Sequence, residues 1–157
     1  MSNVLVVAEL HEGHVRKSTH SAITFARQAS AGGTFGILVL GSTAKAAAAE
    51  LTAFGAAKVI ACEDASLASY VCERFAPTIA AVAKSGGFDT VAVTASSYGK
   101  DLAPRVAAKL GAGYAPDINA VKIDGDKRSY RRPMFAGNAL GWCEITSPMH
   151  VVSVRQT

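Results

Sequence analysis

The chain has 157 residues, of which 50% are hydrophobic and 18% charged, so one domain spanning residues 1–157 can bury a core and disorder is excluded. Its formal net charge of +4 is small, and basic residues do not alternate with aromatic ones, so no nucleic-acid partner is expected. The one basic cluster indicates a solvated hairpin or a partner-facing edge, and it comprises Lys127, Arg128, Arg131 and Arg132.

The first half of the chain alternates between strand and helix signals. Residues 3–9 are a continuous apolar run, typical of a strand buried on both faces of a parallel sheet. Residues 18–31 carry apolar side chains at helical spacing and stop at a pair of glycines, which predicts a helix. A strand over residues 34–40, a helix over 44–54 and a strand over 58–61 follow.

The pattern continues to residue 110. Residues 67–84 predict a long helix, which Pro77 is expected to kink or divide. Residues 90–94 predict a strand, and a helix is expected to start at Gly99 or Lys100 and to end at Leu110.

After Gly113 the segments are short and extended, over residues 118–123, 129–136, 140–145 and 150–155, with turn residues between them. Gly137 and Asn138 suit a tight hairpin because both tolerate positive φ. Pro133 lacks an amide donor and belongs at a strand start or edge. The fold class is therefore α/β, with a mainly parallel sheet covered on both faces and a mostly antiparallel C-terminal end.

A candidate ligand site follows from this topology. Open parallel sheets bind ligands at the carboxyl ends of their strands. If the first and fourth strands are neighbours, the loops over residues 9–14 and 95–100 meet there. The second loop predicts a nucleotide or anion site through Ser96, Ser97, Gly99 and Lys100. The alternative is that the serines cap the helix and the glycine relieves the turn.

Other polar residues give weaker signals. Three histidines and two carboxylates, namely His11, His14, His20, Glu9 and Glu12, look like a metal cluster but lack a known ligand spacing. We expect a solvated loop there and no metal. Ser96 and Ser97 lack the partners of a nucleophile. Tyr98 and Trp142 could stack on a flavin or adenine ring, but core or edge positions are the simpler interpretation.

The cysteines are Cys62, Cys72 and Cys143, an odd number without metal spacing, which favours free thiols in a reducing compartment. Cys62 and Cys72 could be redox partners only if the fold brings them together. No signal peptide, Arg-rich leader or apolar run of bilayer length is present, so we expect no membrane insertion and a bacterial cytoplasmic location, or the mitochondrial matrix for a trimmed chain.

Two stretches carry a family resemblance. SSYGKDLAPRVAAKLG at residues 96–111 and RRPMFAGNAL at 131–140, supported by residues 4–9, 55–59 and 151–155, resemble the N-terminal domain of the electron transfer flavoprotein alpha subunit. Trp142-Cys143 and Met134-Phe135 depart slightly from the family pattern. The resemblance implies a Rossmann-like fold of the adenine nucleotide alpha hydrolase type. It also implies that FAD is held mainly by a C-terminal domain, which is absent from this chain.

The resemblance implies a scaffold that packs on a beta subunit, which binds AMP in its equivalent fold. Electrons would pass from acyl-CoA or other flavin dehydrogenases to a quinone oxidoreductase, and this segment would be an electron-carrier part without catalytic residues of its own. The expected partner interface consists of Arg131, Arg132, Pro133, Phe135, Gly137 and Asn138. Alternatives are a stand-alone adenine-nucleotide binding module similar to universal stress proteins, and a purely structural assembly protein.

Overall fold

The computed structural model describes residues 2–156. Its central sheet contains six parallel strands in the order β5-β4-β1-β6-β11-β7. In chain order these strands are β1 (Asn3–Val7), β4 (Thr34–Gly41), β5 (Lys58–Glu63), β6 (Thr90–Thr94), β7 (Gly113–Ile118) and β11 (His150–Val154). The α/β class and the mainly parallel sheet are confirmed.

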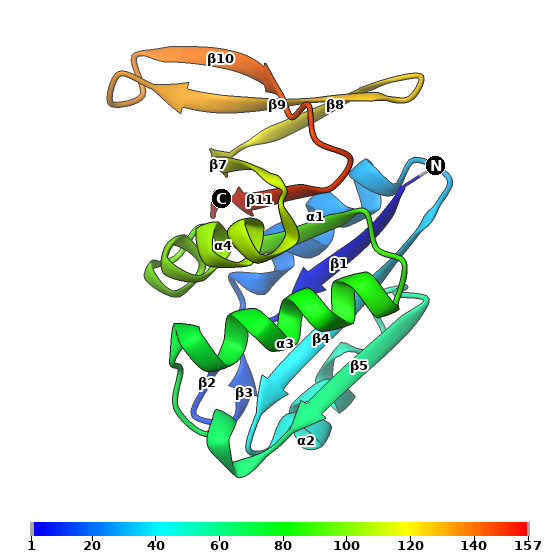
Figure 1. The fold of residues 1–157 in the computed structure, drawn as a ribbon, viewed down its shortest axis with the longest axis vertical. Coiled ribbons are helices and arrows are strands. Elements are labelled where there is room, and N and C mark those ends of the chain that lie inside the picture. The colour runs from blue at the N-terminus through cyan, green and yellow to red at the C-terminus, as the bar shows by residue number, and fades with distance from the viewer. Residues whose placement is uncertain (1, 157) are drawn as a thin grey trace.

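Helices cover both faces of this sheet (Figure 1). On one face lie α1 (Thr19–Ser30) and α2 (Ala44–Ala48), the latter continued by the 3-10 turn η1 (Ala49–Leu51). On the other lie α3 (Cys72–Ser85) and α4 (Ser97–Leu110). Alternate side chains of β1 serve the two faces: Val4 and Val6 pack toward α1 and α2, and Leu5 packs toward α3 and α4. This two-sided burial explains why the strands are continuous apolar runs.

A second, antiparallel sheet lies beyond β7 at one end of the molecule (Figure 1). Its strands are β8 (Ala120–Asp124), β9 (Lys127–Met134) and β10 (Ala139–Glu144), in the order β10-β9-β8. Tyr130 of β9 is fully buried in the core beside α1, and its hydroxyl lies 2.7 Å from His150 Nδ1 on β11. The two sheets are therefore joined through a buried polar contact.

The C-terminal end differs from the prediction in one respect. The sequence pattern places the segment 150–155 among the antiparallel strands, but β11 lies between β6 and β7 and is parallel to both. Every residue of β11 is buried, which only a central strand requires. Strand β7 was not predicted over residues 113–117, because a proline and an aspartate interrupt its apolar pattern.

The predicted helix over residues 67–84 is also corrected. Residues Ala65–Leu67 form the short 3-10 turn η2, and α3 begins only at Cys72. The helix is not divided at Pro77, which lies within it. The proline removes one hydrogen bond, to the carbonyl of exposed Glu73, while a buried face that includes Phe75 and Ile79 holds the helix on the sheet. The helix predicted over 44–54 is shorter as well, ending in η1 at Leu51.

Candidate functional site

The loops that follow β1 and β6 meet at the carboxyl end of the sheet. The two strands are hydrogen-bonded neighbours, as the topology argument required. The Ser96 hydroxyl donates a hydrogen bond to Glu9 Oε1, joining residues 87 apart in sequence. The predicted crevice between these loops therefore exists.

Glu9 is the anchor of this crevice. It is only 5% exposed, and its second carboxylate oxygen lies 3.2 Å from Arg16 Nε. Its backbone amide donates to the Thr19 hydroxyl at 3.2 Å, at the start of α1. A buried carboxylate is costly unless it is paired and hydrogen-bonded, and this one is both.

The N-terminus of α4 is capped by its own serine. Ser96 has extended backbone angles, and its Oγ accepts a hydrogen bond from the Gly99 amide at 3.1 Å. A Cβ on Gly99 would lie 1.7 Å from the Thr94 carbonyl oxygen, so glycine permits the close packing of α4 on β6. The capping interpretation is thus confirmed for Ser96, while Ser97 is exposed and makes no cap.

Two adjoining cavities open at this edge, and we call them together the carboxyl-end crevice. The larger one, of about 710 Å³, is lined by Glu9, Leu10, Arg16, Tyr70, Ser96, Ser97, Tyr98, Asp101 and Gln156. A smaller one, of about 170 Å³, shares Leu10, Tyr70 and Tyr98 and extends to Glu12 and the Gly41–Thr43 segment. Lys100 is exposed on α4 and lines neither cavity, so the cation that the sequence supplied for an anion site lies outside the crevice.

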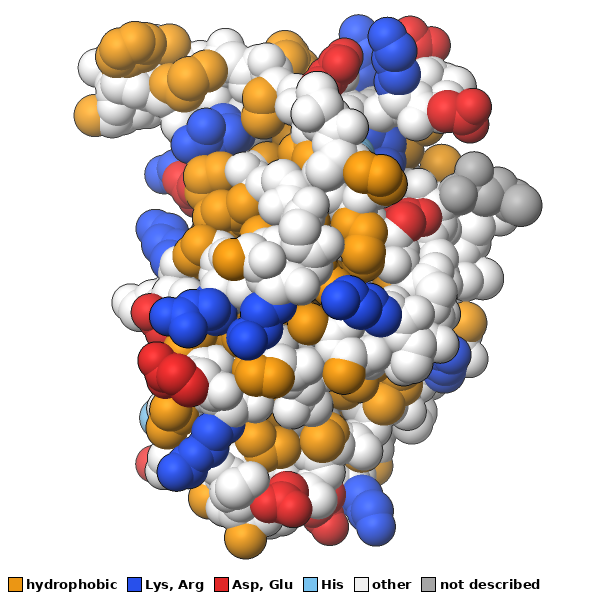
Figure 2. Space-filling model, in the orientation of Figure 1, with side chains coloured by type: hydrophobic (Ala, Val, Ile, Leu, Met, Phe, Trp, Pro, Cys, Tyr) orange, Lys and Arg blue, Asp and Glu red, His pale blue; other side chains and the backbone are white. Residues whose placement is uncertain are grey.

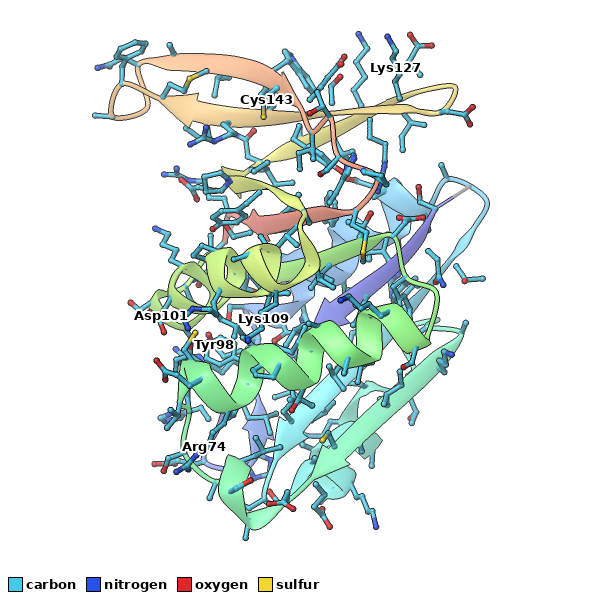
Figure 3. The ribbon with its side chains drawn as sticks, in the orientation of Figure 1. Arg74, Tyr98, Asp101, Lys109, Lys127 and Cys143 are labelled. Carbon is cyan, nitrogen blue, oxygen red and sulfur yellow. The ribbon has the colours of Figure 1, made fainter. Side chains whose placement is uncertain are left out.

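Aromatic side chains form one wall of the crevice. The rings of Tyr70 and Tyr98 are 4.6 Å apart between centroids, and Phe75 packs edge-on at 5.1 Å from Tyr70. The Tyr70 hydroxyl donates to Asp101 Oδ2 at 2.6 Å. Burial raises the pKa of Tyr98 and of Tyr70, and the bond to Asp101 raises that of Tyr70 further. Figure 3 labels Tyr98 and Asp101 at the start of α4, close to the first turn of α3.

The histidines do not assemble into a site. His11 and His14 face each other across the short hairpin of β2 (Leu10–His11) and β3 (His14–Val15), which the sequence did not predict as strands. His20 packs its ring 5.0 Å from Phe54 instead. Within residues 2–156, no three His, Cys, Asp or Glu side chains lie close enough together to hold a metal ion.

The cysteines are three half-buried free thiols. Cys62 lies on β5 and Cys72 at the start of α3. The hydrogen-bonding partner of the Cys72 thiol is the Asp101 carbonyl oxygen, which lies 3.8 Å from Cys72 Sγ. Cys143 packs against the core between the two sheets.

A second candidate surface is the β9–β10 hairpin. Among residues 2–156, every large hydrophobic side chain that is exposed to solvent belongs to this hairpin. These side chains and their exposed fractions are Met134 (37%), Phe135 (81%), Leu140 (55%) and Trp142 (50%). We call these four residues the apolar hairpin; Figure 2 shows hydrophobic side chains gathered at the end of the molecule where β9 and β10 lie. Monomeric proteins rarely expose such a cluster without a partner.

The turn of this hairpin is longer than predicted. Phe135 and Ala136 were expected in the strand, but they lie in the turn with φ of 51° and 54°, followed by Gly137 at 87°. Asn138 does not have positive φ, so that part of the prediction is wrong. Pro133 pairs with Leu140 in the part of β9 that extends past β8, which places it at a locally free edge as expected.

The two predicted interface arginines are half-buried and bonded within the chain. Arg131 Nε donates to Asn119 Oδ1 at 2.9 Å, and its guanidinium lies 5.8 Å from the centre of the Trp142 ring. Arg132 Nε donates to the Pro116 carbonyl at 2.8 Å. Both hold the antiparallel sheet near β7, so they position the apolar hairpin.

Sequence reasoning missed several residues of both surfaces. Leu140 and Trp142 could have been found, because their two-residue spacing places them on one face of a strand. No pattern in the sequence predicts the hydrogen bond between Tyr70 and Asp101, because 31 residues separate them and their contact depends on how α3 packs on α4.

Comparison with known proteins gives a consistent result. The family model described as "Electron transfer flavoprotein domain" matches residues 4–157. "Electron transfer flavoprotein subunit alpha" of Bacillus subtilis (strain 168) is 30% identical over 152 residues, covering 97% of this chain and 47% of the relative. "Probable electron transfer flavoprotein subunit alpha, mitochondrial" of Caenorhabditis elegans is 32% identical over 158 residues, covering 100% of this chain and 46% of the relative.

The chain spans about half the length of the curated relatives that it matches. Among the described residues, no helix combines the length and the apolar character needed to cross a membrane.

Proposed function

The chain belongs to the electron transfer flavoprotein family, and on that premise we propose that it is an alpha-type N-terminal scaffold domain that packs on a beta subunit and supports FAD-mediated electron transfer. The match to alpha subunits over the whole chain supports this assignment. The apolar hairpin is the observation on which the proposal mainly depends, because it supplies an exposed surface suited to a protein partner.

The hairpin has the chemistry of an interface centre. Interfaces concentrate aromatic residues, methionine and arginine at their core. One face of this hairpin carries Leu140, Trp142 and the stacked Arg131, while Met134 lies on the opposite face and Phe135 in the exposed turn. We assign the interface to these residues together with Arg132, Pro133, Gly137 and Asn138. Phe135, Ala136 and Gly137 form the turn. Arg132 bonds the antiparallel sheet to β7 through Pro116, and Arg131 bonds it to Asn119, which follows β7.

The crevice does not suit FAD. The pyrophosphate of a dinucleotide would meet three carboxylates, Glu9, Glu12 and Asp101, with Arg16 as the only cation lining the described cavities. We therefore propose that FAD lies mainly in a C-terminal domain and that AMP, where present, lies in the beta subunit. The flavin supplies the redox chemistry, and the residues of this chain hold the subunits in place.

We further propose that the complex accepts electrons from acyl-CoA or other flavin dehydrogenases and delivers them to a quinone oxidoreductase. Family membership supports these partners at the level of class. A reducing compartment, the bacterial cytoplasm or the mitochondrial matrix, agrees with the three free thiols.

Co-purification tests the interface. A tagged chain is co-expressed with its cognate beta subunit, either unchanged or as the double variant Leu140→Ser and Trp142→Ser. Because both side chains are at least half exposed, the double variant is expected to keep its thermal melting and to lose most of the bound beta subunit, with affinity falling at least about tenfold.

The matched control is the double variant Lys84→Ser and Lys109→Ser, two exposed positions on α3 and α4. It is expected to retain the beta subunit. Equal retention by the hairpin variant, or loss of the subunit from the control alone, would contradict the proposed interface.

A further inference from the structure

We propose that the carboxyl-end crevice binds an uncharged, hydroxyl-bearing ligand of nucleoside size, and that Glu9 keeps phosphorylated forms of it out. This site is separate from the apolar hairpin, so the inference does not rest on the proposed function. It depends on the shape, the charges and the free polar groups of the crevice.

The position and size of the crevice suit a small ligand. It lies at the carboxyl ends of β1 and β6, where the winding of the sheet reverses. From β1 the chain proceeds to β4 and β5 on one side, and it then returns from β5 to β6 on the other side of β1. Its larger cavity, of about 710 Å³, falls in the range of small-molecule sites. Tyr70 lines both cavities and offers a half-buried aromatic surface against which a base can pack.

The charges of the crevice select against anions. Glu9, Glu12 and Asp101 contribute three negative charges, and Arg16, already paired with Glu9 at 3.2 Å, contributes one positive charge. A phosphate entering here would meet a net negative site. The repulsion is strongest from Glu9, which is buried, and weaker from Glu12 and Asp101, which are exposed and screened by solvent and salt.

The start of α4 offers an anion fewer donors than an uncapped helix would. The Gly99 amide already donates to Ser96 Oγ, and the Ser96 hydroxyl proton is directed to Glu9. These two groups are therefore committed to the protein, which leaves the amides of Ser97 and Tyr98 as the donors at the start of α4 without an acceptor among residues 2–156, near the Glu9 carboxylate to which Ser96 is bonded. Glu9 thus disfavours phosphate binding in two ways. Its negative charge repels the phosphate, and its carboxylate accepts the Ser96 hydroxyl proton, which could otherwise be donated to the phosphate.

The larger cavity of the crevice still offers groups that can accept hydrogen bonds from the hydroxyls of a ligand. Tyr70 occupies only Oδ2 of Asp101, and Asp101 is exposed at the mouth of the larger cavity. Ser97 is exposed beside it, and the Gln156 side chain lies on the same rim. Carboxylate oxygens are good acceptors for the two hydroxyls of a ribose, whereas they repel a phosphate.

The test is a titration of the 157-residue chain with adenosine and with AMP, in which binding is measured by isothermal calorimetry and by ligand-observed NMR. Adenosine is expected to saturate the chain in the millimolar range or below, and AMP to bind at least about tenfold more weakly. The variant Asp101→Asn is expected to weaken adenosine binding several-fold, because it removes a charged acceptor while keeping a partner for Tyr70.

The variant Glu9→Gln is expected to narrow or reverse the preference for adenosine over AMP, while Glu144→Gln, the same change on exposed β10, leaves it unchanged. Because Glu9 is buried and paired, Glu9→Gln can destabilise the fold. If this variant melts at a much lower temperature than the unchanged chain, the effect of Asp101→Asn on adenosine binding decides the question. No saturable adenosine binding, tighter binding of AMP than of adenosine by the unchanged chain, or adenosine binding unaffected by Asp101→Asn would each overturn the proposal.

Discussion

At the scale of single residues, the junction of the two sheets depends on a few buried polar side chains. Arg128 of β9 donates from Nη1 to the Thr90 hydroxyl at 2.6 Å and lies 3.4 Å from Asp89 Oδ1. Beside it, the Tyr130 hydroxyl meets His150. Burial lowers the pKa of His150, and the Arg128 charge lowers it further, while Asp89 acts in the opposite direction. Burial raises the pKa of Tyr130 to about 12.

His150 should make stability fall in acid. Because its pKa is lowered in the folded chain, the unfolded chain binds the proton more readily, and protonation favours unfolding. The contribution is complete above the ordinary histidine pKa of about 6.5 and is lost as the pH falls below that value. Denaturant unfolding between neutral and mildly acidic pH should therefore show a shallower pH dependence for His150→Asn, which keeps a hydrogen-bonding atom near Tyr130. Identical slopes for the variant and the unchanged chain would exclude this role.

At the scale of elements, the β9–β10 turn fixes where the apolar side chains point. Three successive residues, Phe135, Ala136 and Gly137, have positive φ, and the amides of Gly137 and Asn138 donate to Met134 and Phe135 at 3.1 Å each. Two of these residues carry side chains in a conformation that L-residues rarely adopt. The turn is therefore held by its hydrogen bonds and by the strands on both sides.

Gly137→Val should loosen this turn. A branched residue at φ of 87° adds about 1–2 kcal/mol of backbone strain, although the space around Gly137 is open. We expect a lower melting temperature, local loss of amide protection in β9 and β10, and weaker retention of the beta subunit. Gly137→Asn is the matched control, because asparagine tolerates positive φ. Unchanged melting together with unchanged co-purification of the valine variant would count against this view.

The elements also show what the sequence could and could not predict. Strands β1, β4 and β6 were predictable because burial on both faces demands continuous apolar residues. The meeting of the loops 9–14 and 95–100 was predicted on the condition that the first and fourth strands are neighbours, which they are, and the contact of Glu9 with Ser96 within it was not predicted. Strand β7 could not be predicted, because Pro116 and Asp117 break the pattern and its pairing with β11 bridges a long loop. The start of α3 at Cys72 depends on packing that no local signal records.

At the scale of the whole molecule, the two candidate surfaces lie on different parts of the fold. The apolar hairpin belongs to the antiparallel sheet at one end, whereas the carboxyl-end crevice opens at an edge of the parallel sheet. This separation lets a partner cover the hairpin without filling the crevice. It also means that a defect in one surface can be measured while the other stays intact.

The chain alone should not retain FAD. Its crevice is lined by Glu9, Glu12 and Asp101, whose charges would repel the pyrophosphate of a dinucleotide that entered it. After incubation with excess FAD and desalting, the isolated chain is expected to be colourless, and the yellow colour is expected to require the remainder of an alpha subunit and the beta subunit. A stoichiometric flavin spectrum on the desalted chain would refute this expectation, independently of the result for adenosine.

The place of β11 has a consequence for synthesis on the ribosome. Because β11 supplies the hydrogen-bonding neighbour of both β6 and β7, β7 has no partner in the sheet until β11 has left the exit tunnel. A nascent chain that ends before His150 can pair β5, β4, β1 and β6, but it leaves one edge of β6 open and the antiparallel sheet without its buried histidine contact. This half-built state exposes the kind of strand edge that chaperones protect, so its lifetime is set by how quickly translation delivers residues 150–154.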